Sequence, residues 1–332
     1  MSNLSEYKKL RVDFLTKKYN STLSAFTYNC NLAIIKIQKM RTSTQYKKTL
    51  INKVILDYNN YKTSLLNKLN SDIAFINNLK PEVITILNKY ALLIGSNYPG
   101  TNYQLSGCVN DINFLKDKLS NTYGFNKFTL ITDDLTVKPT RTNILASFKD
   151  FLSQSKSGDF LFFGFSGHGT YVRDTNGDET DGQDETIVSC DLQNIKDDEL
   201  KQIIIENLKP NATLFCVFDS CHSGSVLDLK YQYLDSTNYN SYNQNDKQLE
   251  TNGNVIMISG CMDSQTSEDA YINRVSRGAM IWSFLETINK TPNTSYFDLL
   301  TNMRITLKNS GYSQIPQLSS GKIMDMTQVI KF

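Results

Sequence analysis

LFCVFDSCHSGS, residues 214–225, and FLFFGFSGHGT, residues 160–170, are two apolar runs that each end in polar residues and glycine. Each run has the length of a buried β-strand. The first run ends just before Cys221 and the second ends just before His168. If the two strands are parallel neighbours, both side chains lie at one edge of the sheet, where open α/β sheets bind their ligands.

Further apolar runs of strand length alternate with amphipathic segments of helical length. We predict strands at residues 91–95, 128–132, 159–166, 186–190, 212–219 and 254–259. We predict helices near residues 108–121, 140–155, 197–207, 277–289 and 295–308. This alternation predicts an α/β fold with a mostly parallel central sheet that helices cover on both faces.

The first 88 residues have a different pattern, with apolar residues three and four positions apart, no glycine and a single proline, Pro81. This spacing predicts a helical extension. Residues 1–90 carry 15 Lys and Arg against 5 Asp and Glu, a net charge of +10, which leaves −8 for the remainder. One hypothesis is therefore that the extension packs on the acidic remainder. The alternatives are a contact with anionic lipid or nucleic acid and, as the default, a solvated helical hairpin.

The composition of the chain limits the classes of protein to which it can belong. A chain of 332 residues with 40% hydrophobic content can bury a substantial core. Its six cysteines show no paired spacings, its first residues lack the apolar run of a secretion signal, and no stretch approaches the roughly 18 apolar residues of a membrane span. We expect a soluble, cytoplasmic protein.

Cysteine and histidine at one sheet edge indicate nucleophilic chemistry. Cysteine attacks as the thiolate, and its ordinary pKa of about 8.5 makes a neighbouring histidine base useful. Cys221 is then the nucleophile and His168 the base, while the backbone amides of Gly169 and Cys221 hold the developing oxyanion. The alternatives are a buried, inert cysteine and a structural turn histidine. For His222 we favour a loop-packing role.

Five motifs together resemble the metacaspases, which are caspase-like cysteine peptidases, and specifically their single-chain type. The motifs are LSGCVNDINFLKDKL (105–119), FLFFGFSGHGT (160–170), DGQDETIVSCD (181–191), IKDDEL (195–200) and VFDSCHSGSVLDL (217–229). The resemblance covers roughly residues 90–332. It implies a caspase-like three-layer sandwich with a large-subunit part at 89–228, a polar linker at 229–253 and a small-subunit part at 254–332.

The resemblance also implies an acidic S1 pocket formed by Cys108, Asp111, Ser166 and Asp219, with Asp219 at the position of the caspase glutamine. Buried aspartates facing a long cationic side chain form charge-assisted hydrogen bonds. The substrates are then polypeptides with Lys or Arg at P1. Without the resemblance, Asp111 is interpreted as a carboxylate at the start of a helix.

An acidic segment, residues 174–185, is compared with a calcium-binding EF-hand loop. Glu179 stands where that loop needs glycine, so we reject an EF-hand and keep a cation-site hypothesis. The resemblance implies a Ca²⁺ site whose ligands are Asp184, Asp197, Asp198 and Asp228. The alternative is an exposed acidic surface.

The sequence therefore predicts a calcium-dependent cysteine endopeptidase that cleaves after Lys or Arg, acts as a monomer and needs no nucleic acid. Lys230 and Lys247 lie in the stretch 229–253, which we predict to be an exposed loop, and are candidate self-cleavage sites. A catalytically silent caspase-like scaffold is the alternative. A cysteine phosphatase is excluded because its C-x5-R signature has leucine, Leu227, in place of arginine.

Overall fold

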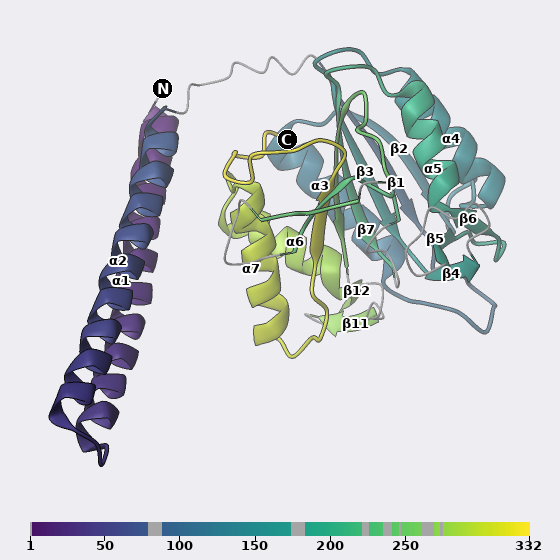
Figure 1. The fold of residues 1–332 in the computed structure, drawn as a ribbon. Helices are drawn as coiled ribbons and strands as arrows, with labels where there is room; N and C mark the ends of the chain where they lie inside the picture. Colours follow the sequence, from purple (N-terminus) through teal and green to yellow (C-terminus); the bar gives the residue numbers. More distant parts are fainter. Residues whose placement is uncertain are drawn as a thin grey trace. The chain divides into compact units, whose positions relative to one another are not determined.

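The computed structural model describes residues 2–78, 88–173, 183–220, 226–234, 241–245, 247–260, 269–272 and 275–332. The chain divides into two compact units, Met1–Ile84 and Thr85–Phe332. Each unit has its own secondary structure, and Figure 1 shows both.

The first unit is a hairpin of two long helices, α1 (Ser2–Lys39) and α2 (Thr44–Asn78). Phe26 of α1 packs on Tyr61 of α2 with ring centroids 4.2 Å apart, and the Thr27 hydroxyl donates to the Tyr58 hydroxyl at 3.3 Å. The prediction of a helical N-terminal extension is confirmed. No helix in the described part of the chain has both the length and the apolar character that crossing a membrane requires.

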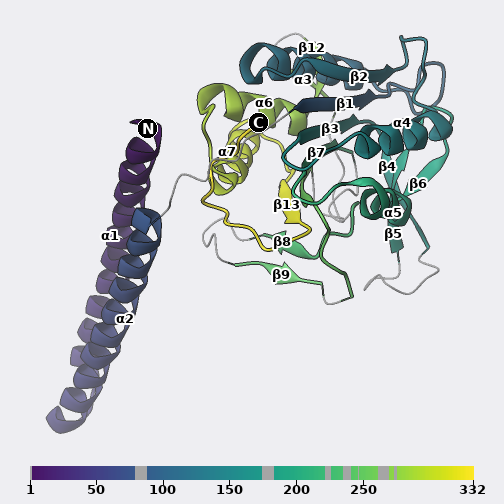
Figure 2. The ribbon, with the colours of Figure 1, turned by 90° about the horizontal axis from the view of Figure 1, so that it is seen from above.

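The second unit contains a central sheet whose strand order is β2-β1-β3-β7-β10-β13-β8-β9 (Figure 2). Five neighbouring strands run parallel, in keeping with their continuous apolar sequences. They are β2 (Lys127–Thr132), β1 (Lys89–Gly95), β3 (Phe160–Ser166), β7 (Thr213–Asp219) and β10 (Asn254–Ser259). The antiparallel continuation consists of β13 (Gln317–Ser320), β8 (Tyr231–Tyr233) and β9 (Asn243–Gln244).

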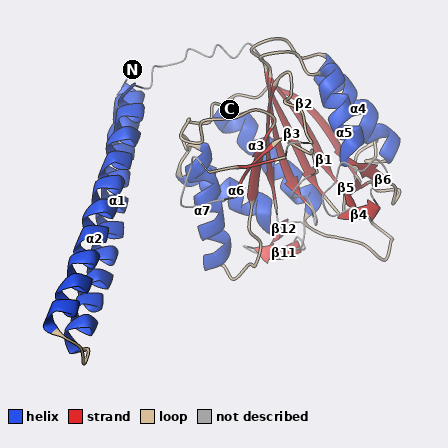
Figure 3. Ribbon diagram, viewed as in Figure 1, coloured by secondary structure: helices blue, strands red, loops and turns tan. Residues whose placement is uncertain are grey.

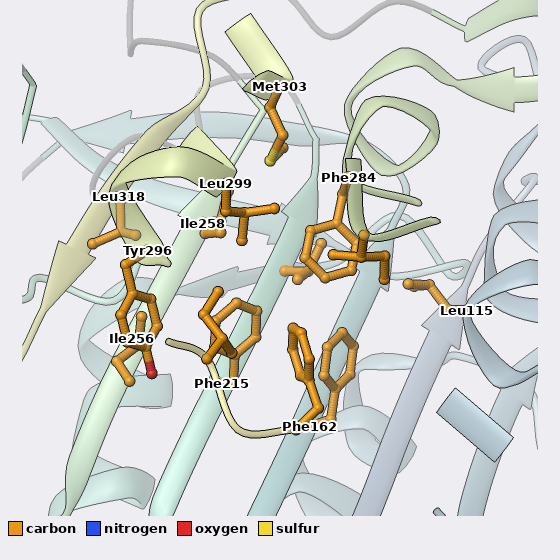
Figure 4. Packing of buried hydrophobic residues seen from close by; sticks show 14 of the residues in the cluster. Leu115, Phe162, Phe215, Ile256, Ile258, Phe284, Tyr296, Leu299, Met303 and Leu318 are labelled. Carbon is orange, nitrogen blue, oxygen red and sulfur yellow. The ribbon is translucent and has the colours of Figure 1, made fainter. Parts of the chain in front are cut away.

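Helices cover both faces of this sheet, which makes three layers (Figure 3). One face carries α3 (Cys108–Tyr123), α6 (Ala279–Lys290) and α7 (Tyr296–Asn309), and the other carries α4 (Arg141–Ser153) and α5 (Asp197–Asn207). The alternation of side chains along each strand supplies both cores. Phe162 and Phe215 belong to the α6 side, with Phe284 and Leu299 above them in Figure 4, whereas Phe163 belongs to the α4 side.

Two smaller sheets flank the central one. An antiparallel sheet contains β4 (Gly169–Arg173), β5 (Gln183–Val188) and β6 (Asn194–Lys196). A hairpin contains β11 (Asp269–Ile272) and β12 (Val275–Gly278). The predicted strand at 186–190 therefore belongs to a small antiparallel sheet, and the other predicted strands form the parallel part of the central sheet. All five predicted helices are present.

One prediction is wrong. Residues 229–253 are not simply an exposed loop, because they contain β8, which pairs with β13, and β9, which pairs with β8 at the edge of the sheet. Leu229, Tyr231 and Tyr233 are buried, and both tyrosines join the α6-side core. The alternation Tyr-Gln-Tyr is the strand signal. It was masked by the surrounding Asn, Ser and Asp, which are typical of loops.

Candidate active site

The carboxyl ends of β3 and β7 lie side by side at one edge of the central sheet. Ser166 pairs with Asp219 in the parallel register of these strands, and the Gly167 amide donates to the Asp219 carbonyl at 3.2 Å. The prediction that the two strands are parallel neighbours is confirmed. His168 follows directly at this edge. Cys221 and His222 lie outside the described residues.

His168 is held by hydrogen bonds from two directions. Its backbone amide donates to the Tyr98 hydroxyl at 2.7 Å, and its Nε2 lies 2.7 Å from the Tyr103 carbonyl oxygen. A carbonyl oxygen only accepts, so we assign the hydrogen to Nε2 and the lone pair to Nδ1. Nδ1 is then the atom that can take a proton from a nucleophile.

Tyr98 is a site residue that the sequence reasoning missed. It is fully buried, its ring centroid is 4.7 Å from that of His168, and its hydroxyl donates to the Val188 carbonyl at 2.7 Å. Burial raises the pKa of Tyr98, so the hydroxyl keeps its proton. Gly167 must be glycine here, because a Cβ would stand 2.7 Å from the Tyr98 hydroxyl. The sequence could have indicated Tyr98 as a site residue by its position, three residues after the end of β1, at the carboxyl edge of the sheet.

Gly169 begins β4 and pairs with Ile187 of β5. The Val188 amide donates to the His168 carbonyl at 2.9 Å, so the backbone on both sides of the histidine is anchored to the small antiparallel sheet. His168 and Gly169 are partly exposed, whereas Ser166 is buried. The histidine is therefore partly accessible to solvent at this edge.

The structure brings Asp111, Ser166 and Asp219 together beside this edge. The Ser166 hydroxyl donates to Asp111 Oδ2 at 3.0 Å, and the Gly278 amide donates to the same oxygen at 2.8 Å. Asp219 Oδ2 accepts from the Ile281 amide at 2.8 Å. Both carboxylates therefore contact the N-terminus of α6, where backbone N–H groups and the helix dipole favour negative charge.

The two carboxylates are close enough to influence each other. Asp111 is completely buried, and burial followed by the charge of Asp219 raises its pKa well above the usual range. Gly278 separates them, since a Cβ at this position would overlap Asp219 Oδ2 and lie 2.9 Å from Asp111 Oδ2. The amides of Gly278 and Ile281 were not predicted as part of the site, because they come from a distant segment and carry no side-chain signal.

Cys108 lies at the start of α3, buried and next to the same strand ends. Its backbone amide donates to Asn97 Oδ1 at 2.9 Å, and a Cβ on Gly95 would stand 2.8 Å from its carbonyl oxygen. The close approach of α3 to β1 fixes the start of this helix. Asp111, one turn further on, is thereby placed over Ser166.

A second acidic cluster forms where β5 meets the start of α5. Single carboxylate oxygens of Asp184, Asp197 and Asp198 all lie within 4.8 Å of one another. Burial, and then the charge of Asp228, raises the pKa of Asp197 to about 9. The Glu185 amide donates to Asp197 Oδ2 at 2.8 Å.

Cations from the same chain face this cluster. Asp184 forms an ion pair with Lys196, and Asp228 Oδ2 lies 3.9 Å from Lys201 Nζ. Three of the four carboxylates that we predicted as metal ligands are thus together. The charge of Asp228 acts on Asp197, but Asp228 does not belong to the group of three carboxylates whose oxygens lie within 4.8 Å of one another.

A three-layer α/β sandwich with a histidine at the carboxyl edge and two buried aspartates beside it agrees with the class of caspase-like cysteine peptidases. The family profile described as the metacaspase, peptidase C14 domain matches residues 89–230. Metacaspase-1 of Meyerozyma guilliermondii is 36% identical in an alignment of 290 residues covering 72% of this chain and 70% of that protein. For Metacaspase-1A of Aspergillus terreus the identity is 37% over 287 residues, covering 71% of each.

A crystal structure of a protein from Geobacter sulfurreducens has the same fold, with a TM-score of 0.54 and 22% identity, covering 73% of this chain and 97% of that one. The curated relatives show the family. The chain belongs to the metacaspases, and it is a cysteine peptidase, which is a hydrolase.

Replacing Tyr98 by phenylalanine tests its role in holding His168. The variant loses a buried acceptor for the His168 amide and a donor to Val188. We expect kcat to fall roughly tenfold with little change in KM, the effect of losing about 1.4 kcal/mol of hydrogen bonding in the transition state. Tyr103→Phe is the control, since only the Tyr103 carbonyl contacts Nε2. Unchanged kcat in Tyr98→Phe would contradict the assignment.

Asp111→Asn should change how stability depends on pH. Because folding raises the pKa of Asp111 above its ordinary value of 3.8, the folded state binds the extra proton, and stability is lost as the pH rises from that value toward the folded pKa. We expect the free energy of unfolding to fall less steeply in the variant as the pH rises above the ordinary value of 3.8. Urea titrations followed by the single tryptophan, Trp282, measure this.

The exposed Asp150→Asn variant should keep the wild-type slope, because its carboxylate is solvated in both states. Parallel curves for wild type and Asp111→Asn would show that Asp111 ionises normally in the folded protein.

Proposed function

We propose that this metacaspase is a calcium-dependent endopeptidase that cleaves after Lys or Arg. The observation that supports the specificity is the pair of buried carboxylates, Asp111 and Asp219, beside the histidine edge. Two such groups in a low-dielectric site repel each other when ionised, and a cationic side chain relieves that repulsion while donating hydrogen bonds to them. A substrate aspartate at the same position would add a negative charge to a site that already disfavours ionisation of Asp111.

The chemistry follows from the roles of the residues. The Cys221 thiol gives its proton to Nδ1 of His168, and the thiolate forms a bond to the carbonyl carbon of the P1 residue. Backbone amides of Gly169 and Cys221 stabilise the oxyanion. Collapse of this intermediate breaks the C–N bond, and the imidazolium returns the proton to the leaving amine. Water then hydrolyses the thioester, with His168 taking the proton from the water.

Peptides that differ only at P1 test this proposal. We expect a P1 Arg peptide to be cleaved at least about 100-fold more efficiently than its P1 Asp counterpart. The Arg side chain can form two charge-assisted hydrogen bonds with the aspartates, whereas the Asp side chain is repelled by them. Cys221→Ala should abolish the activity. Cys190→Ala is the matched control, since burial raises the pKa of the Cys190 thiol and keeps it protonated. Preferential cleavage of the Asp peptide would overturn the specificity.

Calcium is part of the same proposal, and the acidic cluster at Asp184, Asp197 and Asp198 fits this ion. Calcium binds oxygen ligands at about 2.3–2.6 Å, so two oxygens on one ion lie at most about 5 Å apart. The 4.8 Å limit within the cluster agrees with this geometry. A bound cation would also oppose the burial and the charge of Asp228, which together raise the pKa of Asp197. When bound, it would fix the start of α5 against β5, and Asp228 would supply charge from alongside.

Calcium titrations of the Cys221→Ala protein test this site. We expect Ca²⁺ to raise the melting temperature, and Asp197→Asn to abolish most of that rise without lowering the melting temperature of the metal-free protein, since a pKa of about 9 leaves Asp197 uncharged near pH 7 before calcium binds. Asp150→Asn, an exposed carboxylate, is the control. A full Ca²⁺ response in Asp197→Asn would exclude this cluster as the site.

Self-cleavage remains a proposal for Lys230 and Lys247. Lys247 is exposed, whereas Lys230 is partly buried where β8 begins, and its carbonyl accepts from the Asn245 amide at 2.9 Å. Accessibility therefore favours Lys247 as the site of cleavage.

A further inference from the structure

Arg277 is a buried cation beside the buried Asp111 and Asp219, and none of the roles described so far uses it. It lies on β12, immediately before Gly278, whose amide donates to Asp111. Its side chain is 10% exposed, and its Nε is 3.8 Å from Asp111 Oδ1. One carboxylate oxygen of Asp111 therefore accepts from Gly278 and Ser166, while the other faces an arginine of the same chain.

The contact between Arg277 and Asp111 is incomplete. Among the described residues, neither the buried Nε and Nη2 of Arg277 nor Asp111 Oδ1 has a hydrogen-bond partner. A bidentate arginine–carboxylate pair has N–O distances of about 2.7–2.9 Å, much shorter than the 3.8 Å seen here. The guanidinium thus compensates the charge of Asp111 without the hydrogen bonds that would hold it firmly.

The ring of Phe114 holds the other side of the guanidinium. Arg277 Cζ lies 4.2 Å from the ring centroid of Phe114, which stands three residues after Asp111 on α3. Asn110 of the same helix donates to the Ser276 carbonyl at 2.9 Å, which ties β12 to α3. Arg277 is therefore positioned along α3, between an aromatic ring and the pocket carboxylate.

We propose that Arg277 is a specificity-determining residue, which competes with the basic P1 side chain of a substrate for Asp111. This inference rests on the proposed preference for Lys or Arg at P1. A substrate cation that makes close hydrogen bonds to Asp111 must take over the charge compensation that Arg277 now provides at 3.8 Å. Arg277 thereby weakens the binding of all basic side chains and sets how strongly the pocket discriminates between basic and neutral ones.

The effect of Arg277 on substrate affinity depends on the fraction of molecules in which Arg277 has moved away from Asp111. If Arg277 leaves Asp111 in about one tenth of the molecules, the apparent affinity for a basic side chain is reduced about tenfold. Removing the guanidinium removes this competition. An arginine that served only to position Asp111 would have the opposite effect, because its loss would weaken substrate binding.

Arg277→Met keeps the length and apolar character of the side chain on Phe114 and removes the charge. We expect KM for a P1 Arg peptide to fall about tenfold with kcat within about twofold of wild type, and KM for a neutral P1 peptide to stay unchanged. Phe114→Leu, which alters a partly exposed ring, should lower KM roughly twofold because the guanidinium is held less firmly. Unchanged or higher KM for the P1 Arg peptide in both variants would overturn the proposal.

Arg304→Met is the matched control. Arg304 donates to the Pro316 carbonyl at 2.9 Å from α7, and the variant should keep the wild-type KM. An equal fall in KM in this control would overturn the proposal, because the effect would then not depend on the contact with Asp111.

Benzamidine binding separates this inference from the proposed peptidase specificity. Titration of the Cys221→Ala protein by calorimetry should give a dissociation constant about tenfold lower when Arg277→Met is added. Tighter binding in that variant without cleavage of basic peptides would support competition at Asp111 and reject the peptidase specificity. Equal binding, or no binding to either protein, would overturn the role of Arg277.

Discussion

The burial of two aspartates at the N-terminus of α6 is the constraint on which this site depends. Asp219 ends a strand whose residues 214–218 are all apolar, and Asp111 lies on a helix that places it beside Ser166 at the same sheet edge. Each carboxylate is stabilised by a backbone amide from one segment, Gly278 to Ile281, which lies far from both in sequence. The energetic cost of burying like charges is therefore offset by amides and the helix dipole, and it leaves a site that favours cations.

The same electrostatic principle operates twice in the second unit. In the pocket, Asp111 and Asp219 face Arg277, and at the start of α5 the cluster around Asp197 faces Lys196 and Lys201. In both places burial raises the pKa of a carboxyl group, and cations of the chain compensate only part of the charge. Both places are suited to an added cation, a basic side chain in one and calcium in the other, as proposed above.

The histidine depends on packing rather than on charge. Tyr98, fully buried, accepts from the His168 amide and donates to β5, so the position of the imidazole is linked to the small antiparallel sheet. Gly167 allows this contact because no Cβ intervenes. The acidic cluster includes Asp184 of the same strand, β5. Strand β5 therefore carries one proposed calcium ligand, Asp184, and also contacts Tyr98, which holds His168.

Apolar periodicity in the sequence predicted the alternation of strands and helices, and the apolar runs that end before His168 and Cys221 predicted the shared carboxyl edge. That Asp111, Ser166 and Asp219 gather there was predicted only from the resemblance to the metacaspases. The sequence pattern misjudged residues 229–253, where two tyrosines among polar residues complete the sheet. Only the tertiary structure decided the contributions of Tyr98, Gly278, Ile281 and Arg277. These act through backbone amides, a buried hydroxyl and a contact between segments more than 160 residues apart, and such contacts have no periodic signal in the chain.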